Sequence, residues 1–234
     1  MDWKKVYENK KQTADKAVEM IKSKDTVVLG HAMAEPKELV RALSRNCERY
    51  ENVEIIQMVP LTGELAKPEY EGHFKYNSLF AGGTTRDAVQ EGNADFTPVF
   101  FHEVPKLFKE KLIDVKVALV MVTPPDEHGF CSFGVSVDYT RSAAEEADIV
   151  IAQVNKNMPR TLGNSMIHIN DIDAVVEFDE EIPELQPPVI GDTEKKIGEF
   201  CASLIKDESV LQLGIGAIPD AVLTFLGDKK NLAL

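Results

Sequence analysis

The chain has only three cysteines, and their positions exclude two common uses of this residue. Cys47, Cys131 and Cys201 lack the paired spacing of metal-binding motifs, and their number is odd. A disulfide framework is therefore not expected, and a reducing cytoplasm suits the chain. Cys131 has no basic neighbour or helix N-terminus that would lower its pKa, so we interpret it as a core or loop thiol and not as a nucleophile.

Basic residues are also scarce. The chain has 26 Lys and Arg against 39 Asp and Glu, which gives a net charge of -13 at pH 7. Without a visible basic patch, nucleic acid and anionic membrane surfaces are not expected as partners. Backbone amides and a few placed cations would have to hold any anionic ligand.

Long apolar runs are missing as well. Residues 1–23 are charged throughout and contain no run that suits a signal peptide or a membrane span, so we expect a cytoplasmic protein. The composition, 44% hydrophobic and 28% charged, is typical of a soluble globular protein.

Helical and strand-like patterns alternate along the chain. Residues 117–122 are apolar on both faces, which is typical of a central strand covered by helices on either side. The pattern predicts an α/β fold with an open, mainly parallel sheet and flanking helices. Helices are expected near residues 13–21, 36–43, 85–91, 104–111 and 140–147, and strands at residues 26–30, 53–58, 117–122, 149–154 and 174–178.

An acidic, proline-bearing segment at residues 180–188 predicts a domain boundary. We therefore expect one α/β domain over residues 1–187 and the start of a second α/β domain over residues 188–234. A helix at 192–204, a strand at 210–213, a helix at 219–226 and a strand at 231–234 are expected there. This second domain is expected to be incomplete, and the chain to be a fragment.

The most informative segment is the glycine turn at residues 211–219, which joins an expected strand to an expected helix. Its central residues are Gly214, Ile215, Gly216, Ala217 and Ile218. Glycines let a backbone approach a ligand closely, and the first amides of a helix are unpaired donors that suit an oxyanion or a phosphate. A tight turn without a ligand explains the pattern equally well.

Three other loops are candidate sites. Residues 123–132, with Pro124 and His128, follow the most buried strand, which is where ligands sit in open α/β sheets. An ordered structural loop explains them equally well. Residues 155–161 also follow a strand and could line a site or only turn the chain. The glycines before Arg86 could bind an anion, although an N-cap by Thr84 is the preferred interpretation.

The histidines do not indicate a metal site. His31, His73, His102 and His168 are scattered and share no ligand-like spacing with Cys, Asp or Glu. We expect no bound metal.

Together these motifs resemble the family I coenzyme A transferases, in the branch of acetyl-CoA hydrolases/transferases and 4-hydroxybutyrate or butyryl-CoA:acetate CoA-transferases. The resemblance spans essentially the whole chain. It is carried by Gly30-His31-Ala32 with Glu35-Pro36, residues 97–105, Pro124-Pro125-Asp126 with His128-Gly129-Phe130, Asn155 with Pro159-Arg160, residues 169–173 and residues 211–220.

The resemblance implies two similar α/β halves with the active site between them. It implies a CoA-transferase that moves CoA between a short-chain acyl-CoA, such as 4-hydroxybutyryl-CoA or butyryl-CoA, and acetate. A glutamate attacks the acyl-CoA, and the resulting anhydride becomes a glutamyl-CoA thioester. In the family that glutamate follows the glycine turn by a short strand, so it would lie beyond Leu234 and this chain alone would be inactive.

The same resemblance assigns roles to residues that are present. Residues 214–218 would contact CoA, which is a substrate and acyl carrier here, and Gln212 and Gly214 would support the oxyanion. The loops that carry His31, Met58, Pro124 and His128 would face the acyl group. A homo-oligomer, either a dimer or a tetramer, is expected.

Three alternatives are open. Acetyl-CoA hydrolysis uses the same intermediate with water as acceptor. A non-catalytic ligand-binding module is a second, because the fold is similar to that of sugar-phosphate isomerases and their effector-sensing relatives. A two-chain transferase is disfavoured, because its division should fall near Pro187-Pro188 and not inside a strand.

Overall fold

The computed structural model describes residues 2–233 and divides into two compact units, residues 1–183 and 184–234. The division falls inside the acidic, proline-bearing segment in which the sequence predicts a boundary. Each unit is described by itself. None of the described helices is long and apolar enough to cross a membrane.

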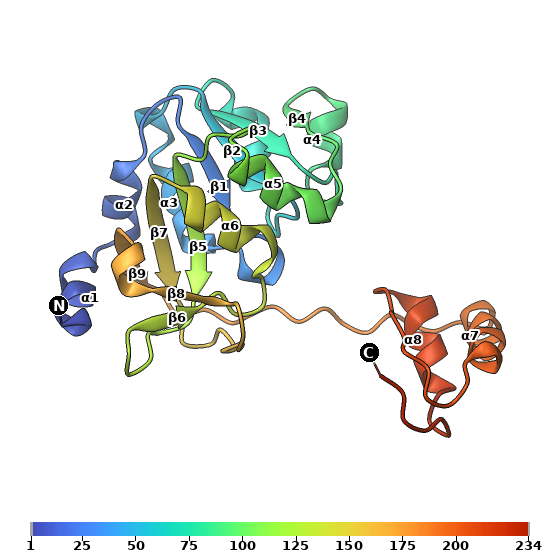
Figure 1. Ribbon diagram of the computed structural model, residues 1–234. Helices are drawn as coiled ribbons and strands as arrows, with labels where there is room; N and C mark the ends of the chain where they lie inside the picture. Colours follow the sequence, from blue (N-terminus) through green and yellow to red (C-terminus); the bar gives the residue numbers. More distant parts are fainter. Residues whose placement is uncertain (1, 234) are drawn as a thin grey trace. The chain divides into compact units, whose positions relative to one another are not determined.

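The first unit is built on a seven-stranded parallel sheet with the order β4-β3-β2-β1-β5-β7-β9, which confirms the predicted fold class (Figure 1). Strand β5 is buried along its whole length, as its apolar sequence predicts. A separate antiparallel pair joins β6 to β8. The strands are β1 (Thr26–Leu29), β2 (Val53–Gln57), β3 (Phe74–Ser78), β4 (Ala94–Phe96), β5 (Val117–Val122), β6 (Phe130–Ser132), β7 (Ile149–Val154), β8 (Met166–His168) and β9 (Ala174–Glu177).

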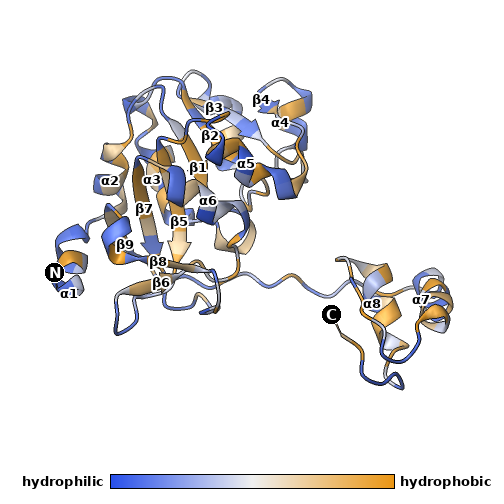
Figure 2. Cartoon of the chain, viewed as in Figure 1, coloured by the Kyte–Doolittle hydropathy of each residue, from blue (hydrophilic) through white to orange (hydrophobic). Residues whose placement is uncertain are grey.

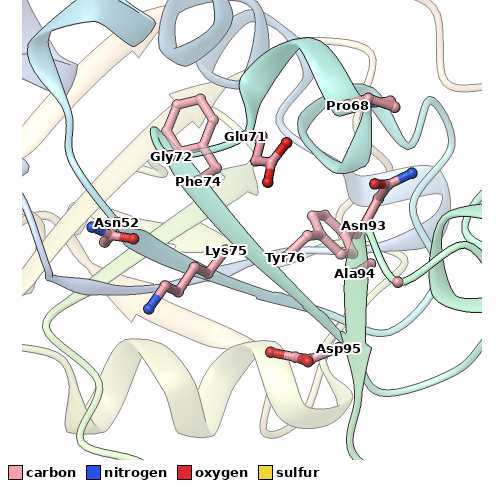
Figure 3. Close-up of a pocket in the computed structure, with 11 residues that line it drawn as sticks. Asn52, Pro68, Glu71, Gly72, Phe74, Lys75, Tyr76, Asn93, Ala94 and Asp95 are labelled. Carbon is pink, nitrogen blue, oxygen red and sulfur yellow. The ribbon is translucent and has the colours of Figure 1, made fainter.

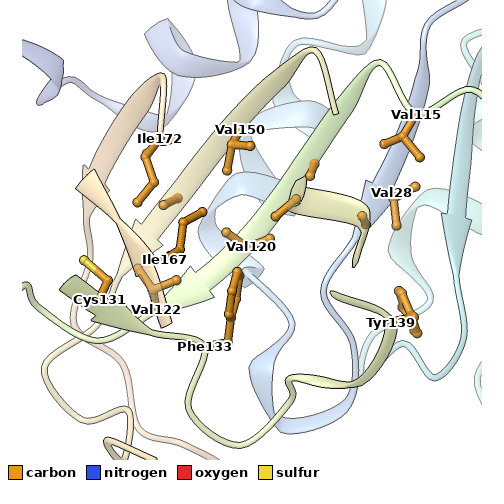
Figure 4. Packing of buried hydrophobic residues seen from close by; sticks show 14 of the residues in the cluster. Val28, Val115, Val120, Val122, Cys131, Phe133, Tyr139, Val150, Ile167 and Ile172 are labelled. Carbon is orange, nitrogen blue, oxygen red and sulfur yellow. The ribbon is translucent and has the colours of Figure 1, made fainter. Parts of the chain in front are cut away.

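Helices cover both faces of the sheet. Side chains alternate between the faces of a strand, so Val28 of β1 and Val120 of β5 pack on one face, while Val27 and Leu119 pack on the other. Helices α1, α5 and α6 contribute to the first cluster, part of which Figure 4 shows, and α2 and α3 contribute to the second. Figure 2 shows the hydrophobic colouring of the central strands. The helices are α1 (Trp3–Lys10), α2 (Ala14–Ala17), α3 (Lys37–Arg45), α4 (Arg86–Gln90), α5 (Val104–Lys109) and α6 (Asp138–Glu146).

Several elements differ from the sequence prediction. The helix expected at residues 13–21 is α2 followed by a 3-10 turn, Val18–Met20. Helix α1 and strands β3, β4, β6 and β8 were not predicted. Strand β3 places Phe74 and Tyr76 in the core but carries polar residues between them, so its pattern lacks the long apolar run of β5.

The second unit consists of α7 (Asp192–Leu204), at the predicted bounds, and α8 (Ala217–Thr224). The strands predicted at residues 210–213 and 231–234 are wrong for the described residues, where only an isolated parallel bridge joins Val210 to Ala233. Leu234 lies outside the described residues. A lone pair of segments lacks the neighbouring strands that turn a bridge into a sheet.

Helices α7 and α8 approach each other closely at Gly198. A Cβ atom on this glycine would lie 2.8 Å from the backbone carbonyl of Ala221. Backbone atoms cannot rotate away as a flexible side chain can, so the two helices would have to separate.

We predict that Gly198→Ala destabilises the second unit by about 1–3 kcal/mol, because the overpacking outweighs the better helix propensity of alanine. Hydrogen exchange of the α7 and α8 amides measures the effect. Lys196→Ala, at an exposed position of the same helix, is the control and should leave protection unchanged. Equal protection in both variants would contradict the prediction.

Candidate active site

The loops that follow β1 and β5 lie where the strand order of the sheet reverses. From β1 the strands β2, β3 and β4 extend to one side, whereas β5, β7 and β9 extend to the other. The strand order therefore reverses between β1 and β5, and open α/β sheets bind ligands beyond the carboxyl ends of their strands at this point. His31 follows β1, Met58 follows β2 and Pro124 follows β5, so three of the predicted substrate-binding residues share this edge.

His31 is held firmly at the switch point. Its side chain is 8% exposed, and Nε2 lies 3.1 Å from Oδ2 of Asp138 in α6. The ring packs on Tyr139, with centroids 4.8 Å apart, and meets Phe101 edge-on at 5.9 Å. Burial raises the pKa of Asp138, but the hydrogen bond and charge of His31, with the Ser136 hydroxyl, outweigh it and hold that pKa below its ordinary value.

The other ring nitrogen of His31 has no such partner. Nδ1 is buried and makes no hydrogen bond within the described residues. With Nε2 directed to Asp138, Nδ1 is the atom left for a ligand. It accepts a hydrogen bond when the ring is neutral and donates one when the ring is protonated.

Tyr139 ties the loops after β1 and β2 together. Its hydroxyl donates to the Leu29 carbonyl at 2.8 Å and accepts from the Met58 amide at 3.3 Å. The Ala32 amide also donates to the Val59 carbonyl at 2.8 Å. The structure therefore brings His31 and Met58 into one rigid arrangement, although Met58 itself is buried.

A buried carboxylate, which sequence reasoning did not identify as a site residue, braces the same loops. Glu35 is 1% exposed and accepts hydrogen bonds from the Leu61 amide at 2.6 Å, the Thr62 hydroxyl at 3.0 Å and the Gln57 side-chain amide at 3.2 Å. Gln57 in turn donates to the Gly30 carbonyl and accepts from Tyr76. Burial raises the pKa of Glu35 despite these donors. The sequence signal that could have pointed to this buried cluster was Gln57, a polar residue at the end of an apolar strand.

The loop after β5 is braced from a neighbouring loop. Asp126 accepts from the amides of His128 and Phe130, each at 2.9 Å, and from Arg160 at 2.6 Å. Burial alone would raise the pKa of Asp126, but these donors hold it below its ordinary value. The His128 side chain is 74% exposed and lies 3.4 Å from Glu127. No hydrogen bond or ring contact among the described residues joins His128 to His31.

The glycine turn belongs to the second unit. Among the described residues, no backbone partner outside α8 accepts from the amides of residues 214–218, and Gly214 and Ile215 are exposed. Gly216 caps the helix with φ of 136°, a conformation that disfavours other residues. Helix α8 begins at Ala217 and not at Pro219. Gln212 is exposed and makes no side-chain hydrogen bond with the described residues.

The structure also tests the sequence-based interpretations of Thr84 and Cys131. The N-cap of α4 is Thr85 without a side-chain bond, and the Thr84 hydroxyl donates instead to the Pro60 carbonyl at 2.9 Å, so the expected Thr84 cap is wrong. Cys131 is buried in the core, which confirms its interpretation as a core thiol, and burial raises its pKa to about 12.

A cleft at the opposite edge of the sheet is not the candidate site. Figure 3 shows it beside Phe74, Tyr76 and Ala94, close to the amino ends of β3 and β4. Its charged lining residues, Glu71, Lys75 and Asp95, are of both signs. It lies near the amino ends of the strands, whereas ligands in open α/β sheets bind beyond the carboxyl ends, where His31 lies.

Residues 1–186 match the acetyl-CoA hydrolase/transferase N-terminal domain, so the chain belongs to the acetyl-CoA hydrolase/transferase family. It is 57% identical to the 4-hydroxybutyrate coenzyme A transferase of Clostridium kluyveri, over 100% of this chain and 55% of that protein. It is 36% identical to the butyryl-CoA:acetate CoA-transferase of Anaerostipes caccae, over 100% of this chain and 54% of that protein.

Solved structures agree. The 4-hydroxybutyrate CoA-transferase of Porphyromonas gingivalis is similar with a TM-score of 0.86 and 40% identity, over 99% of this chain and 55% of that one. RipA from Yersinia pestis is similar with a TM-score of 0.94 and 29% identity, over 100% of this chain and 57% of that one. The chain thus spans about half the length of the relatives it matches.

The raised pKa of Glu35 predicts how the free energy of unfolding depends on pH. Between its unfolded pKa, about 4.3, and its higher folded pKa, the native carboxyl binds more protons than the unfolded one, so the wild type loses stability as pH rises. Glu35→Gln removes this titration. The free energy of unfolding of the variant should therefore improve relative to the wild type as the pH rises above the unfolded pKa of about 4.3.

Urea unfolding at a series of pH values measures this difference. Glu71→Gln, which changes an exposed carboxyl, is the control and should follow the wild-type profile. Parallel profiles for Glu35→Gln and the wild type would refute the assignment.

Proposed function

We propose that this chain is part of a CoA-transferase that moves CoA between a short-chain acyl-CoA, 4-hydroxybutyryl-CoA or butyryl-CoA, and acetate. The observation that carries the proposal is the 57% identity to a 4-hydroxybutyrate coenzyme A transferase over the whole chain. The buried His31 at the switch point supports it, because the side chain offers one unpaired ring nitrogen at the edge where ligands bind.

The proposed reaction is a covalent relay. A glutamate, proposed to lie beyond Leu234, attacks the acyl-CoA carbonyl, which gives an acyl-glutamyl anhydride and releases the CoA thiolate. The thiolate attacks the glutamyl carbonyl, which releases the first acid and leaves a glutamyl-CoA thioester. The second carboxylate attacks that thioester, and the returning thiolate completes the new acyl-CoA. Every step conserves the high-energy acyl bond, so the reaction needs no ATP, and transfer itself needs no metal ion.

The residues of this chain have two proposed roles. The amides of residues 214–218, which have no described backbone acceptor outside α8, contact CoA, and Gly214 with Gln212 supports the oxyanion, a role worth about 3 kcal/mol per donor. In the first unit, His31 and the loops with Met58, Pro124 and His128 contact the acyl group. The braced geometry of His31 and the exposed side chain of His128 make His31 the stronger of the two histidines.

The substrates and setting follow from this proposal. Acyl-CoA and a short-chain carboxylate are the partners, and a cytoplasmic homo-oligomer is proposed. Acetyl-CoA hydrolysis is the second candidate function, because the matched family includes hydrolases as well as transferases. The two differ only in what attacks the glutamyl-CoA thioester: a second carboxylate, which takes up CoA, or water, which releases free CoA.

Product analysis tests the proposal on the full-length protein. With butyryl-CoA or 4-hydroxybutyryl-CoA and acetate, we expect acetyl-CoA to form in proportion to the acyl-CoA consumed, with free CoA nearly constant. The chain ending at Leu234 should show no turnover. Release of free CoA without any need for acetate would establish a hydrolase, and tight binding without turnover would establish a binding module.

His31→Gln in the full-length protein should lower kcat/KM for the acyl-CoA by about threefold to tenfold, as expected for the loss of one hydrogen bond to the acyl group. His128→Gln is the comparison within the same proposed contact set and should change kcat/KM by less than about threefold, because its side chain is exposed. Circular dichroism verifies that both variants fold. Equal effects of the two substitutions would place the acyl group elsewhere.

A further inference from the structure

Three side chains of different chemistry meet near the amino end of β3. Cys47 and Glu48 lie on a 3-10 turn, Cys47–Arg49, and His73 directly precedes β3. The thiol, a carboxylate oxygen and a ring nitrogen all lie within 4.8 Å of one another. Cys47 and Glu48 are consecutive, whereas His73 is distant in the sequence, and the pairing of β2 with β3 brings it to them.

The backbone around this cluster is tightly defined. The Asn52 amide donates to the Gly72 carbonyl and the Val53 amide to the His73 carbonyl, each at 2.9 Å. These bonds extend the β2–β3 ladder up to the histidine. The site therefore does not depend on a mobile loop to assemble.

The orientation of His73 is the second observation that points to a ligand. Nδ1 lies 2.9 Å from the Tyr50 carbonyl oxygen. Because a carbonyl can only accept, Nδ1 carries a proton, and in the neutral ring Nε2 is then the nitrogen with a free lone pair. Metal-bound histidines show this arrangement, in which a backbone carbonyl holds one nitrogen and the metal takes the other.

The other two groups are uncommitted. Within the described residues, neither the Cys47 thiol nor the Glu48 carboxylate makes a hydrogen bond or an ion pair. The neighbouring Arg49 pairs with Glu19 at 3.0 Å instead. No adjacent cation thus neutralises the carboxylate.

We propose that Cys47, Glu48 and His73 bind a divalent zinc-type cation, at a site outside the transfer reaction. Sulfur and imidazole ligands favour zinc over magnesium or calcium, which prefer oxygen. Tetrahedral coordination with bonds of about 2.0–2.3 Å needs donor atoms roughly 3.5 Å apart, so small side-chain rotations complete the site. Cys47 loses its proton to solvent as the metal–sulfur bond forms, and water takes the fourth position.

The site would fasten the 3-10 turn to the start of β3. This departs from the expectation of no metal, which considered only spacing along the chain. Metal binding to the folded state alone raises the thermal midpoint with ion concentration, and the effect is independent of turnover.

The test titrates metal-free protein with Co²⁺, in a Cys201→Ser background that removes the exposed thiol. We expect one Co²⁺ per chain, a thiolate-to-cobalt charge-transfer band in the near ultraviolet, displacement by Zn²⁺, and a higher thermal midpoint with either ion. Cys131 is fully buried and should not contribute.

Variants in the same background assign the ligands. Cys47→Ser should abolish the charge-transfer band, and His73→Gln and Glu48→Gln should each weaken binding by at least about tenfold. His102→Gln, at an exposed histidine elsewhere, is the matched control and should bind as the parent does.

Circular dichroism without metal verifies that the variants fold. Glu48→Gln changes an exposed side chain and should therefore fold even where the other variants do not. Absence of saturable Co²⁺ binding in the parent, a band that persists in Cys47→Ser, or unchanged affinity in Glu48→Gln would overturn the proposal.

Discussion

The candidate site in the first unit depends on one interaction, the hydrogen bonding of the Tyr139 hydroxyl. From helix α6 it donates to the last carbonyl of β1 and accepts from the first amide after β2, so one side chain sets the distance between two strand ends. The same ring supports His31. Because these groups are buried, leaving any of them unpaired would be destabilising by about 1–3 kcal/mol, and the arrangement is therefore rigid.

Polar bracing of this kind lies where strands end, beside a central strand that is apolar. Both faces of β5 are filled by aliphatic side chains, whereas Glu35 and Gln57 lie buried where the strands end. Glu35 carries the raised pKa expected of a buried carboxyl, yet it has three hydrogen-bond donors. The fold thus tolerates buried polar groups where they position loops, and the central strand β5 carries none.

Elements with a strong local pattern were predicted well from the sequence. Strands β5 and β7 and helix α7 have the predicted bounds, because continuous apolar runs and regular helical spacing are local signals. Strand β3 was missed, since polar residues interrupt its apolar pattern. Only its pairing with neighbouring strands defines it as a strand. The role of Glu35 was missed for a related reason. Its donors at residues 57, 61 and 62 become neighbours only when β1 and β2 pair.

The sequence by itself determined the α/β class, the family and the loops where ligands would be sought. Tertiary structure decided which loop residues act together. His31 and His128 are equivalent as loop histidines in the sequence, but packing against Tyr139 buries one and leaves the other in solvent. Likewise, His73 shares no motif spacing with the adjacent Cys47 and Glu48, and strand pairing makes it their neighbour. The reason is physical: contacts between distant segments follow from the register of the sheet, which local patterns do not encode.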